Sequence, residues 1–340
     1  MKMIQEKLER VEFIDIFRGI GILMMIMGHI GFGGKFDYFI HAFHMPMFFF
    51  ISGYFYKKKD ISIKKFIIQK SKTLLIPYIT FGLFHYGIWC GINLIKDIPI
   101  NLNPVLHLLF ENTSELPIAG ALWFLTSLFF VDITYFIMKK FIKNEVIISI
   151  FIFIIAILGC FAINILPFRL PWALDTAFVG IGLYHIAQLM KIHMKNKYIY
   201  TLFHMRWFQC LFLGVVCCIL IFTNGYINMR IGMYSIIPLF WINAIMAILI
   251  GWNISRFIEK ISVKYSIFKM TSLWLKNVGK NSIIYVCLNQ LVIHAYDIFA
   301  NYILIPQIVN KIIELILVMF ILYICDLIIR NTKLKIIIGK

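Results

Sequence analysis

The stretch that decides the fold lies near the start of the chain and reads Asp15-Ile16-Phe17-Arg18-Gly19-Ile20-Gly21-Ile22-Leu23-Met24-Met25-Ile26-Met27-Gly28-His29. It has the length and apolar composition of a membrane-spanning helix. Charged and titratable side chains are unfavourable in hydrocarbon, so Arg18 and His29 predict a functional role for this helix. They share one helix face and are separated by about three turns, or about 16 Å along the axis.

The composition predicts a polytopic membrane protein. Of the 340 residues, 61% are hydrophobic and only 14% are charged, a balance that soluble globular proteins do not show. The net charge of +17 comes largely from lysines in short clusters between apolar runs, which is typical of cytoplasmic loops and not of nucleic-acid binding. We therefore expect membrane lipid, and no nucleic acid, among the partners.

Apolar runs of the length needed to cross a bilayer predict an all-α integral membrane protein with about ten transmembrane helices. We expect them at 13–31, 37–56, 74–95, 119–138, 145–166, 171–190, 208–226, 232–254, 281–303 and 307–329. An even number of spans places both termini on the same side. No separate soluble domain is visible, so residues 1–340 are predicted to form a single transmembrane domain.

The distribution of lysine and arginine predicts the orientation. If the N-terminus is cytoplasmic, the inner segments hold most of the cations, including the lysine-rich segment 57–72 and the basic segment 256–280. The positive-inside rule then makes both termini cytoplasmic. The bias toward Ile, Lys and Asn is typical of an AT-rich bacterial genome, so we expect a multi-pass protein of the bacterial cytoplasmic membrane.

Two histidines near the predicted outer face are candidates for proton transfer. His29 ends the first span, a glycine-rich turn follows, and the second span brings His44 close to it. A neutral imidazole can accept a proton near pH 7, and Asp175, also near the outer face, is the best candidate to orient His29. The alternative for His44 is a helix-start residue whose imidazole hydrogen-bonds the backbone. The histidines lack metal-ligand spacing and a nearby carboxylate, so we expect no metal.

Arg18 allows two interpretations. Its forked donors suit a phosphate or polar amide entering from the cytosol, or the side chain extends to the inner headgroups. Asp15, three residues earlier, can neutralise it. The segment 57–72 is also open to two interpretations, because its lysines can lie on anionic lipid or meet the phosphates of a cytosolic cofactor.

Several motifs in order along the chain resemble the acyltransferase 3 family of bacterial membrane proteins, and within it the fucose 4-O-acetylase-like branch of polysaccharide O-acetyltransferases. Arg18 and His29 match its arginine, ten residues, histidine signature. The other matching motifs are Phe43-His44-Met45-Pro46-Met47-Phe48-Phe49-Phe50-Ile51-Ser52-Gly53-Tyr54, Ile76-Pro77-Tyr78, Leu122-Trp123-Phe124-Leu125, Leu170-Pro171-Trp172-Ala173-Leu174-Asp175, Asn228-Met229-Arg230 and Val278-Gly279-Lys280-Asn281-Ser282. Similar proteins often carry a histidine at the position of Asn289, which cannot transfer a proton at neutral pH.

The resemblance implies an enzyme that transfers an acetyl or similar acyl group from acyl-CoA, such as acetyl-CoA, on the cytoplasmic side. The acceptor would be a hydroxyl of an envelope glycan or a lipid-linked sugar. His29, Arg18, His44 and Asp175 are the expected catalytic residues, and the expected donor-binding residues are Arg18, Asp15 and Ser52. The competing interpretations are a transporter or flippase that uses the same polar residues without covalent chemistry, and a partner in polysaccharide export.

Overall fold

The computed structural model describes residues 12–110, 119–300 and 305–339, which form helices with no β-strand among them. The α-helices are α1 (Glu12–Ile30), α2 (Gly34–Tyr54), α3 (Ile63–Lys70), α4 (Ile76–Ile95), α5 (Asn103–Phe110), α6 (Trp123–Phe141), α7 (Glu145–Ile165), α8 (Leu174–Ile192), α9 (Lys197–Phe203), α10 (Trp207–Asn224), α11 (Ile237–Ser262), α12 (Ser266–Lys280), α13 (Ser282–Ala300) and α14 (Gln307–Asn331).

Within the described ranges, nine helical segments are long and apolar enough to cross a membrane. They correspond to nine of the ten predicted spans, so the prediction of an all-α integral membrane protein is confirmed. The tenth predicted span, 37–56, is helical and corresponds to α2, which has 21 residues. Polar side chains such as Asp37 and His41 lower its mean hydropathy, so α2 is not among the nine segments. The predicted span 74–95 is the end of a longer helical run, 63–95, in which a π-helical turn, Ser71–Leu75, joins α3 to α4.

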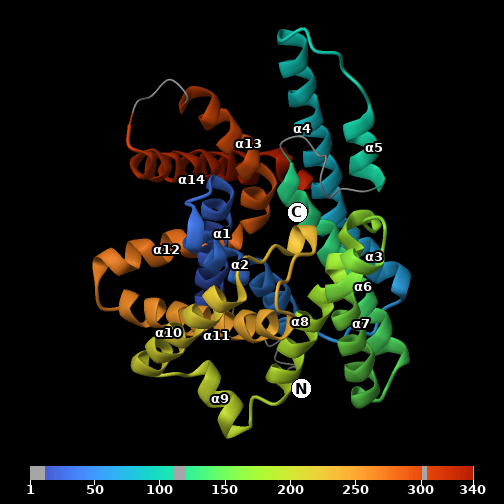
Figure 1. Cartoon of the computed structure of the whole chain (residues 1–340), viewed down its shortest axis with the longest axis vertical. Coiled ribbons are helices and arrows are strands. Elements are labelled where there is room, and N and C mark those ends of the chain that lie inside the picture. The colour runs from blue at the N-terminus through green and yellow to red at the C-terminus, as the bar shows by residue number, and fades with distance from the viewer. Residues whose placement is uncertain (1–11, 111–118, 301–304, 340) are drawn as a thin grey trace, which may run out of the picture.

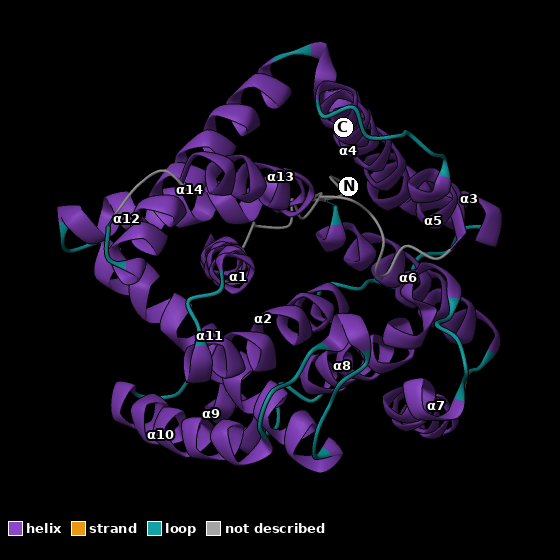
Figure 2. Cartoon of the chain, turned by 45° about the horizontal axis from the view of Figure 1, so that its top comes forward, coloured by secondary structure: helices purple, strands orange, loops and turns teal. Residues whose placement is uncertain are grey.

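Helix α1 lies at the centre of the molecule with the other long helices around it (Figures 1 and 2). Its most extensive contact is with α12, where two glycines let the backbones touch. A Cβ atom at Gly19 would lie 2.2 Å from the carbonyl oxygen of Leu275, and one at Gly279 would lie 1.9 Å from that of Asp15. Small residues at helix crossings provide this close packing in membrane proteins, and here they hold the helix that carries Arg18 and His29.

Helix α2 is packed against α8 in a similar way. A Cβ atom at Gly53 would lie 2.1 Å from the carbonyl oxygen of Tyr184, and the side chain of Gln188 on α8 donates a hydrogen bond to the Gly53 carbonyl oxygen. The phenylalanines in the middle of α2, such as Phe49 and Phe50, are fully buried. Helix α2 is therefore a packed core element despite its polar start.

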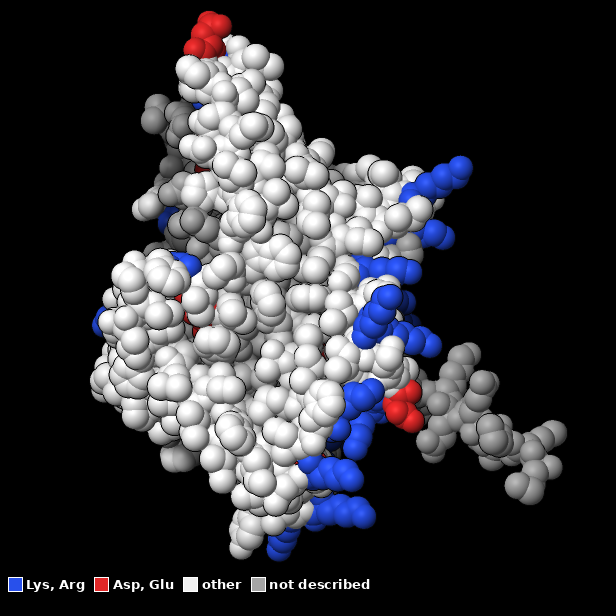
Figure 3. All heavy atoms as spheres, turned by 90° about the vertical axis from the view of Figure 1, so that its right-hand side faces the viewer, with Lys and Arg blue, Asp and Glu red and all other residues white. Residues whose placement is uncertain are grey.

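Contacts between the predicted inner segments place them on one face. The joining pairs are Lys140 Nζ with Ile61 O (2.8 Å), Lys191 Nζ with Tyr54 O (2.6 Å), Arg256 Nη1 with Phe203 O (2.6 Å) and Lys276 with Glu12. Gly339 lies against the backbone of Lys72, so both ends of the described chain are on this face. Figure 3 shows the lysine and arginine side chains gathered along one edge of the molecule. By the positive-inside rule, this cation-rich face is predicted to be cytoplasmic.

This topology predicts the reactivity of single cysteines introduced after the seven native cysteines have been replaced. Lys58 and Lys195 are exposed in inner segments and Asn101 is exposed in an outer one. In intact cells, an impermeant thiol reagent should therefore label a cysteine at position 101 and spare those at 58 and 195. Disruption of the cells should make all three cysteines react. Labelling of position 58 before disruption would show that the orientation is opposite to the predicted one.

Candidate active site

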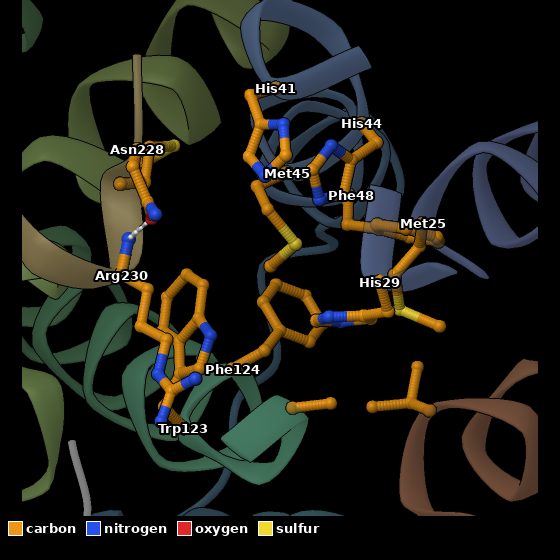
Figure 4. A pocket seen from close by; sticks show the side chains of 13 residues that line it. Met25, His29, His41, His44, Met45, Phe48, Trp123, Phe124, Asn228 and Arg230 are labelled. Carbon is orange, nitrogen blue, oxygen red and sulfur yellow. Dashed lines mark hydrogen bonds between the residues drawn. The ribbon is translucent and has the colours of Figure 1, made fainter. Parts of the chain in front are cut away.

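A cavity with three histidines in its wall lies where α1, α2, α6 and α13 converge. Its volume is about 120 Å³, and its lining residues are Met25, His29, His41, His44, Met45, Phe48, Ala121, Trp123, Phe124, Asn228, Met229, Arg230 and Val286. We call it the histidine cavity. In Figure 4 the imidazole of His29 extends from α1 toward the middle of this group of side chains. The structure thus brings His29 and His44 together, as predicted, and adds His41.

The backbone of α2 determines the tautomers of His41 and His44. The carbonyl oxygens of Asp37 and Ile40 lie 2.9 Å and 2.7 Å from their respective Nδ1 atoms. Because a carbonyl oxygen can only accept, each Nδ1 must carry the proton, and each Nε2 keeps a free lone pair. The backbone hydrogen bond considered as an alternative for His44 is therefore present, and it leaves the other ring nitrogen able to accept a proton.

His29 is held instead by a side chain, because Gln290 on α13 places its amide nitrogen 3.2 Å from His29 Nδ1. A glutamine amide can present its N–H or, after a half-turn, its oxygen. In the arrangement shown, the amide nitrogen of Gln290 donates to Nδ1, so Nε2 carries the proton of a neutral His29. With the amide turned over, its oxygen accepts from Nδ1–H and Nε2 is available as a base. The orientation of the Gln290 amide thus sets the tautomer of His29.

The loop between α10 and α11 forms one wall of the histidine cavity. Asn228 Oδ1 accepts from the backbone N–H of Arg230 at 3.0 Å, drawn as the dashed line in Figure 4, and Arg230 packs over Gly120. Burial lowers the pKa of Arg230, and the cation of Arg169 adds to this effect, yet a guanidinium stays protonated at neutral pH. The cavity therefore holds a fixed positive charge beside its histidines.

Asp175 lies behind this wall and does not line the cavity. Its carboxylate pairs with Arg169, and Arg169 in turn donates from Nη2 to the carbonyl oxygen of Arg230 at 2.8 Å. The expected partnership between Asp175 and His29 is replaced by that between Gln290 and His29. Sequence position alone suggested the wrong pair, because several polar residues share the same depth in the membrane. Asp175 instead anchors the loop that carries Arg230.

A second cavity, of about 320 Å³, opens among the lysines of the cation-rich face. Its lining residues are Ser52, Phe55, Tyr56, Lys57, Lys59, Phe66, Lys70, Thr73, Leu74, Leu128, Asp132 and Tyr184, and we call it the lysine cavity. An adjoining hollow of about 610 Å³ shares Tyr56 and Lys59 with it and adds Lys58, Asp60, Phe136, Lys139 and Lys140. Together they form a cationic vestibule.

One acidic side chain anchors the floor of the lysine cavity. Asp132 is buried, pairs with Lys70 at 2.7 Å between Nζ and Oδ2, and accepts from the Tyr184 hydroxyl at 2.9 Å. A buried carboxylate needs such partners because burial of an uncompensated charge is strongly unfavourable. Lys70 therefore neutralises Asp132. No described carboxylate forms an ion pair with Lys57 or Lys59.

The predicted donor-binding residues lie at this end of the molecule. Ser52 lines the lysine cavity. Arg18 lies over the ring of Phe55, with 5.6 Å from its Cζ to the ring centroid, and Phe55 itself lines the cavity. Asp15 is buried, and its Oδ1 lies 3.5 Å from Arg18 Nη1. Arg18 therefore borders the lysine cavity, and Asp15 supports Arg18 from behind.

The histidine and lysine cavities are aligned along the same faces of α2 and α6. On α2, Phe48 lines the first and Ser52 the second, and on α6, Phe124 lines the first and Leu128 the second. A spacing of four residues is about one helical turn, or about 6 Å. The rings of Phe48 and Phe124, with centroids 5.6 Å apart, lie at the junction between the two cavities.

A family model described as an acyltransferase domain matches residues 11–330. The chain belongs to the acyltransferase 3 family. It is accordingly a multi-pass membrane acyltransferase, and the match covers every helix that contributes to the two cavities. No curated protein matches the chain.

Two polar residues that line this acyltransferase's histidine cavity, His41 and Arg230, and a third that contacts His29, Gln290, were not among the site residues expected from the sequence. Arg230 and His41 were visible as polar residues near the predicted outer face. Gln290 follows Asn289, the position at which similar proteins often carry a histidine. The side-chain amide of Asn289 donates to the carbonyl oxygens of Tyr285 and Val286 in its own helix, so Gln290 and not Asn289 contacts His29. A polar residue in an apolar helix was the available signal for Gln290.

The described part of the chain contains no group of three or more His, Cys, Asp or Glu side chains arranged to hold a metal ion. The histidine cavity presents imidazole nitrogens, which can act as bases, and the guanidinium of Arg230, which donates hydrogen bonds. A base beside a fixed cation, enclosed by aromatic side chains, suits the attack of a hydroxyl on an acyl carbon.

Proposed function

We propose that this acyltransferase transfers an acetyl or similar short acyl group from cytosolic acyl-CoA to a hydroxyl of an envelope glycan or lipid-linked sugar. It would act in the bacterial cytoplasmic membrane, as the polysaccharide O-acetyltransferases of the fucose 4-O-acetylase-like branch are expected to do. The observation that carries the proposal is the alignment of a lysine cavity and a histidine cavity about one helical turn apart along α2 and α6.

The lysine cavity and its adjoining hollow suit the donor. Coenzyme A carries several phosphates, and Lys57, Lys59 and Lys140 offer cations for them. Arg18 at the edge can add a forked, charge-assisted contact. The acyl end of the donor would then point along the α2–α6 seam, past Phe48 and Phe124, toward the histidines.

The histidine cavity suits the acceptor and the chemistry. His29 takes the proton from the sugar hydroxyl, whose oxygen attacks the thioester carbonyl carbon. A carbon–oxygen bond forms, the carbon–sulfur bond breaks, and the coenzyme A thiolate that leaves takes the proton from the His29 imidazolium, which restores the neutral base. Arg230 provides positive charge near the oxygen that becomes negative in the intermediate, while Trp123 offers an aromatic face to the sugar ring.

The experiment that tests this function uses the full-length protein in proteoliposomes, with labelled acetyl-CoA inside and a bacterial envelope glycan outside. Label should appear covalently on the glycan, and Arg18→Ala should raise the KM for acetyl-CoA about 10-fold with a smaller change in kcat. This is because a contact to the cofactor contributes equally to the ground and transition states.

The matched control is Lys195→Ala, an exposed cation of the same face that lies outside the lysine cavity and its adjoining hollow, and it should leave the KM unchanged. Translocation of unmodified glycan in the absence of any acyl donor would indicate a transporter. An Arg18→Ala protein with normal donor binding and no turnover would assign Arg18 to the chemical step instead.

A further inference from the structure

A third cationic pocket lies on the cation-rich face, apart from the lysine cavity. It has a volume of about 380 Å³, and its lining residues are His204, Met205, Arg206, Trp207, Phe208, Arg256, Phe257 and Lys260. It is formed between the start of α10 and the end of α11. None of these residues lines the histidine or lysine cavity, so the proposed acyl transfer does not use it.

The pocket continues into a long apolar groove with a volume of about 690 Å³. The groove is lined by Ile20, Met24, Phe39, Phe43, Trp207, Cys210, Leu211, Gly214, Val215, Cys218, Ile219, Phe222, Ala247, Ile250, Gly251, Ile254 and Phe257. Trp207 and Phe257 belong to both the pocket and the groove. From Trp207 to Phe222 the groove follows α10 for about 22 Å, which is most of the hydrocarbon thickness of about 30 Å.

The charge of the pocket is positive, and the carboxylate of Glu259 is close enough to Arg256 to interact with it electrostatically without pairing. No described carboxylate forms an ion pair with Arg206, Arg256 or Lys260, and Glu259 does not line the pocket. Arg256 is fixed by donating to the carbonyl oxygen of Phe203 at 2.6 Å. His204 is neutral near pH 7, because burial and the neighbouring Arg256 lower its pKa.

We propose that this pocket and groove together bind one anionic phospholipid of the leaflet at the cation-rich face. The phosphate lies against Arg206, Arg256 and Lys260, and one hydrocarbon chain lies in the groove. Basic pockets between transmembrane helices at the cytoplasmic side are suited to anionic headgroups. The combination of a cationic end and a wholly apolar extension matches a phospholipid and does not match a soluble phosphate.

The bound chain would contact the helices of the active site from behind. Ile20 and Met24 lie on α1 between Arg18 and His29, and Phe43 on α2 immediately precedes His44. Filling the groove therefore supports the packing of α1 and α2 at the histidine cavity. The site is thus a structural lipid site that stabilises the catalytic helices.

The groove is tested with the full-length protein in phosphatidylcholine nanodiscs that contain a trace of photoreactive phosphatidylglycerol or photoreactive phosphatidylcholine. Crosslinked peptides are counted by mass spectrometry. Phosphatidylglycerol should label α10 and α11 at least 5-fold more than phosphatidylcholine. Gly214→Phe should reduce this labelling at least 5-fold, because Gly214 lines the groove and the added ring fills it. Gly87→Phe on α4 lies outside the groove and should leave the labelling unchanged. The two substitutions are comparable, because a Cβ atom at either glycine meets no atom within 4 Å.

The headgroup pocket is tested with the double variant Arg206→Gln and Lys260→Gln. It should remove most of the preference for phosphatidylglycerol, whereas a control in which the exposed Lys195 and Lys269 are both replaced by glutamine should keep it. Glycerol phosphate in solution should not compete. Equal labelling by the two lipids, an unaffected double variant, or displacement by glycerol phosphate would each overturn the proposal.

Discussion

Replacing His29 with glutamine should lower the kcat of acyl transfer by about 100-fold or more, because a general base typically contributes at least that much to the rate. Glutamine keeps a polar side chain that can still hydrogen-bond the amide of Gln290, which lies 3.2 Å from His29 Nδ1, but it cannot take up a proton. Binding of acyl-CoA should persist, since the donor contacts lie in the lysine cavity. The measurement is single-turnover transfer from labelled acetyl-CoA together with donor binding at equilibrium.

The control for this variant is His193→Gln, an exposed histidine of the cation-rich face that lies outside the histidine cavity, and it should retain full activity. Near-normal turnover of His29→Gln would remove His29 from its proposed role. The chemistry would then fall to His41 or His44, because the backbone contacts of their Nδ1 atoms leave each Nε2 able to accept a proton.

Replacing Gly53 with alanine should destabilise the protein by about 3 kcal/mol or more, at the upper end of the effects of overpacking. The added Cβ atom would lie 2.1 Å from the carbonyl oxygen of Tyr184 and 2.6 Å from its Cα atom. Both are backbone atoms and cannot rotate away, so α2 and α8 must separate. The apparent midpoint of thermal unfolding in detergent should fall, and the yield of monodisperse protein should fall with it.

Gly87→Ala is the matched control, because a Cβ atom at position 87 meets nothing within 4 Å. In a helix, alanine is more favourable than glycine by roughly 0.5–1 kcal/mol, so this variant should be as stable as the parent or more so. The two substitutions are chemically identical, but Gly53→Ala should lower the stability of the protein, whereas Gly87→Ala should preserve or raise it. A Gly53→Ala protein with an unchanged unfolding midpoint would show that the α2–α8 contact is looser than the structure describes.

The membrane helices could be predicted from the sequence because the requirement for a span is local. A run of apolar residues long enough to cross hydrocarbon must be helical, since every backbone polar group needs a partner within the segment. The helix expected at 37–56 is present as α2, although His41 and Asp37 lower its apolar character. Burial of Phe49 and Phe50 against neighbouring helices keeps it in the core, so that tertiary packing replaces lipid around the middle of this helix.

The candidate site was only partly predictable for the same physical reason. His29 and Arg18 were visible because both interrupt one apolar helix, and His44 because the short turn before α2 brings it near His29. Asp175 was assigned to the wrong partner, since depth in the membrane limits which residues can meet but does not pair them.

The sequence by itself determined the class of the protein, its spans, the clustering of its cations and the helix that carries Arg18 and His29, because these depend on hydrophobicity and charge within single segments. Only the tertiary structure decided that Gln290 and not Asp175 holds His29, that Arg230 enters the same cavity, and that Phe48 and Ser52 line two different cavities. Those relations join residues from different helices, and they depend on how glycines such as Gly53 and Gly279 let the backbones approach.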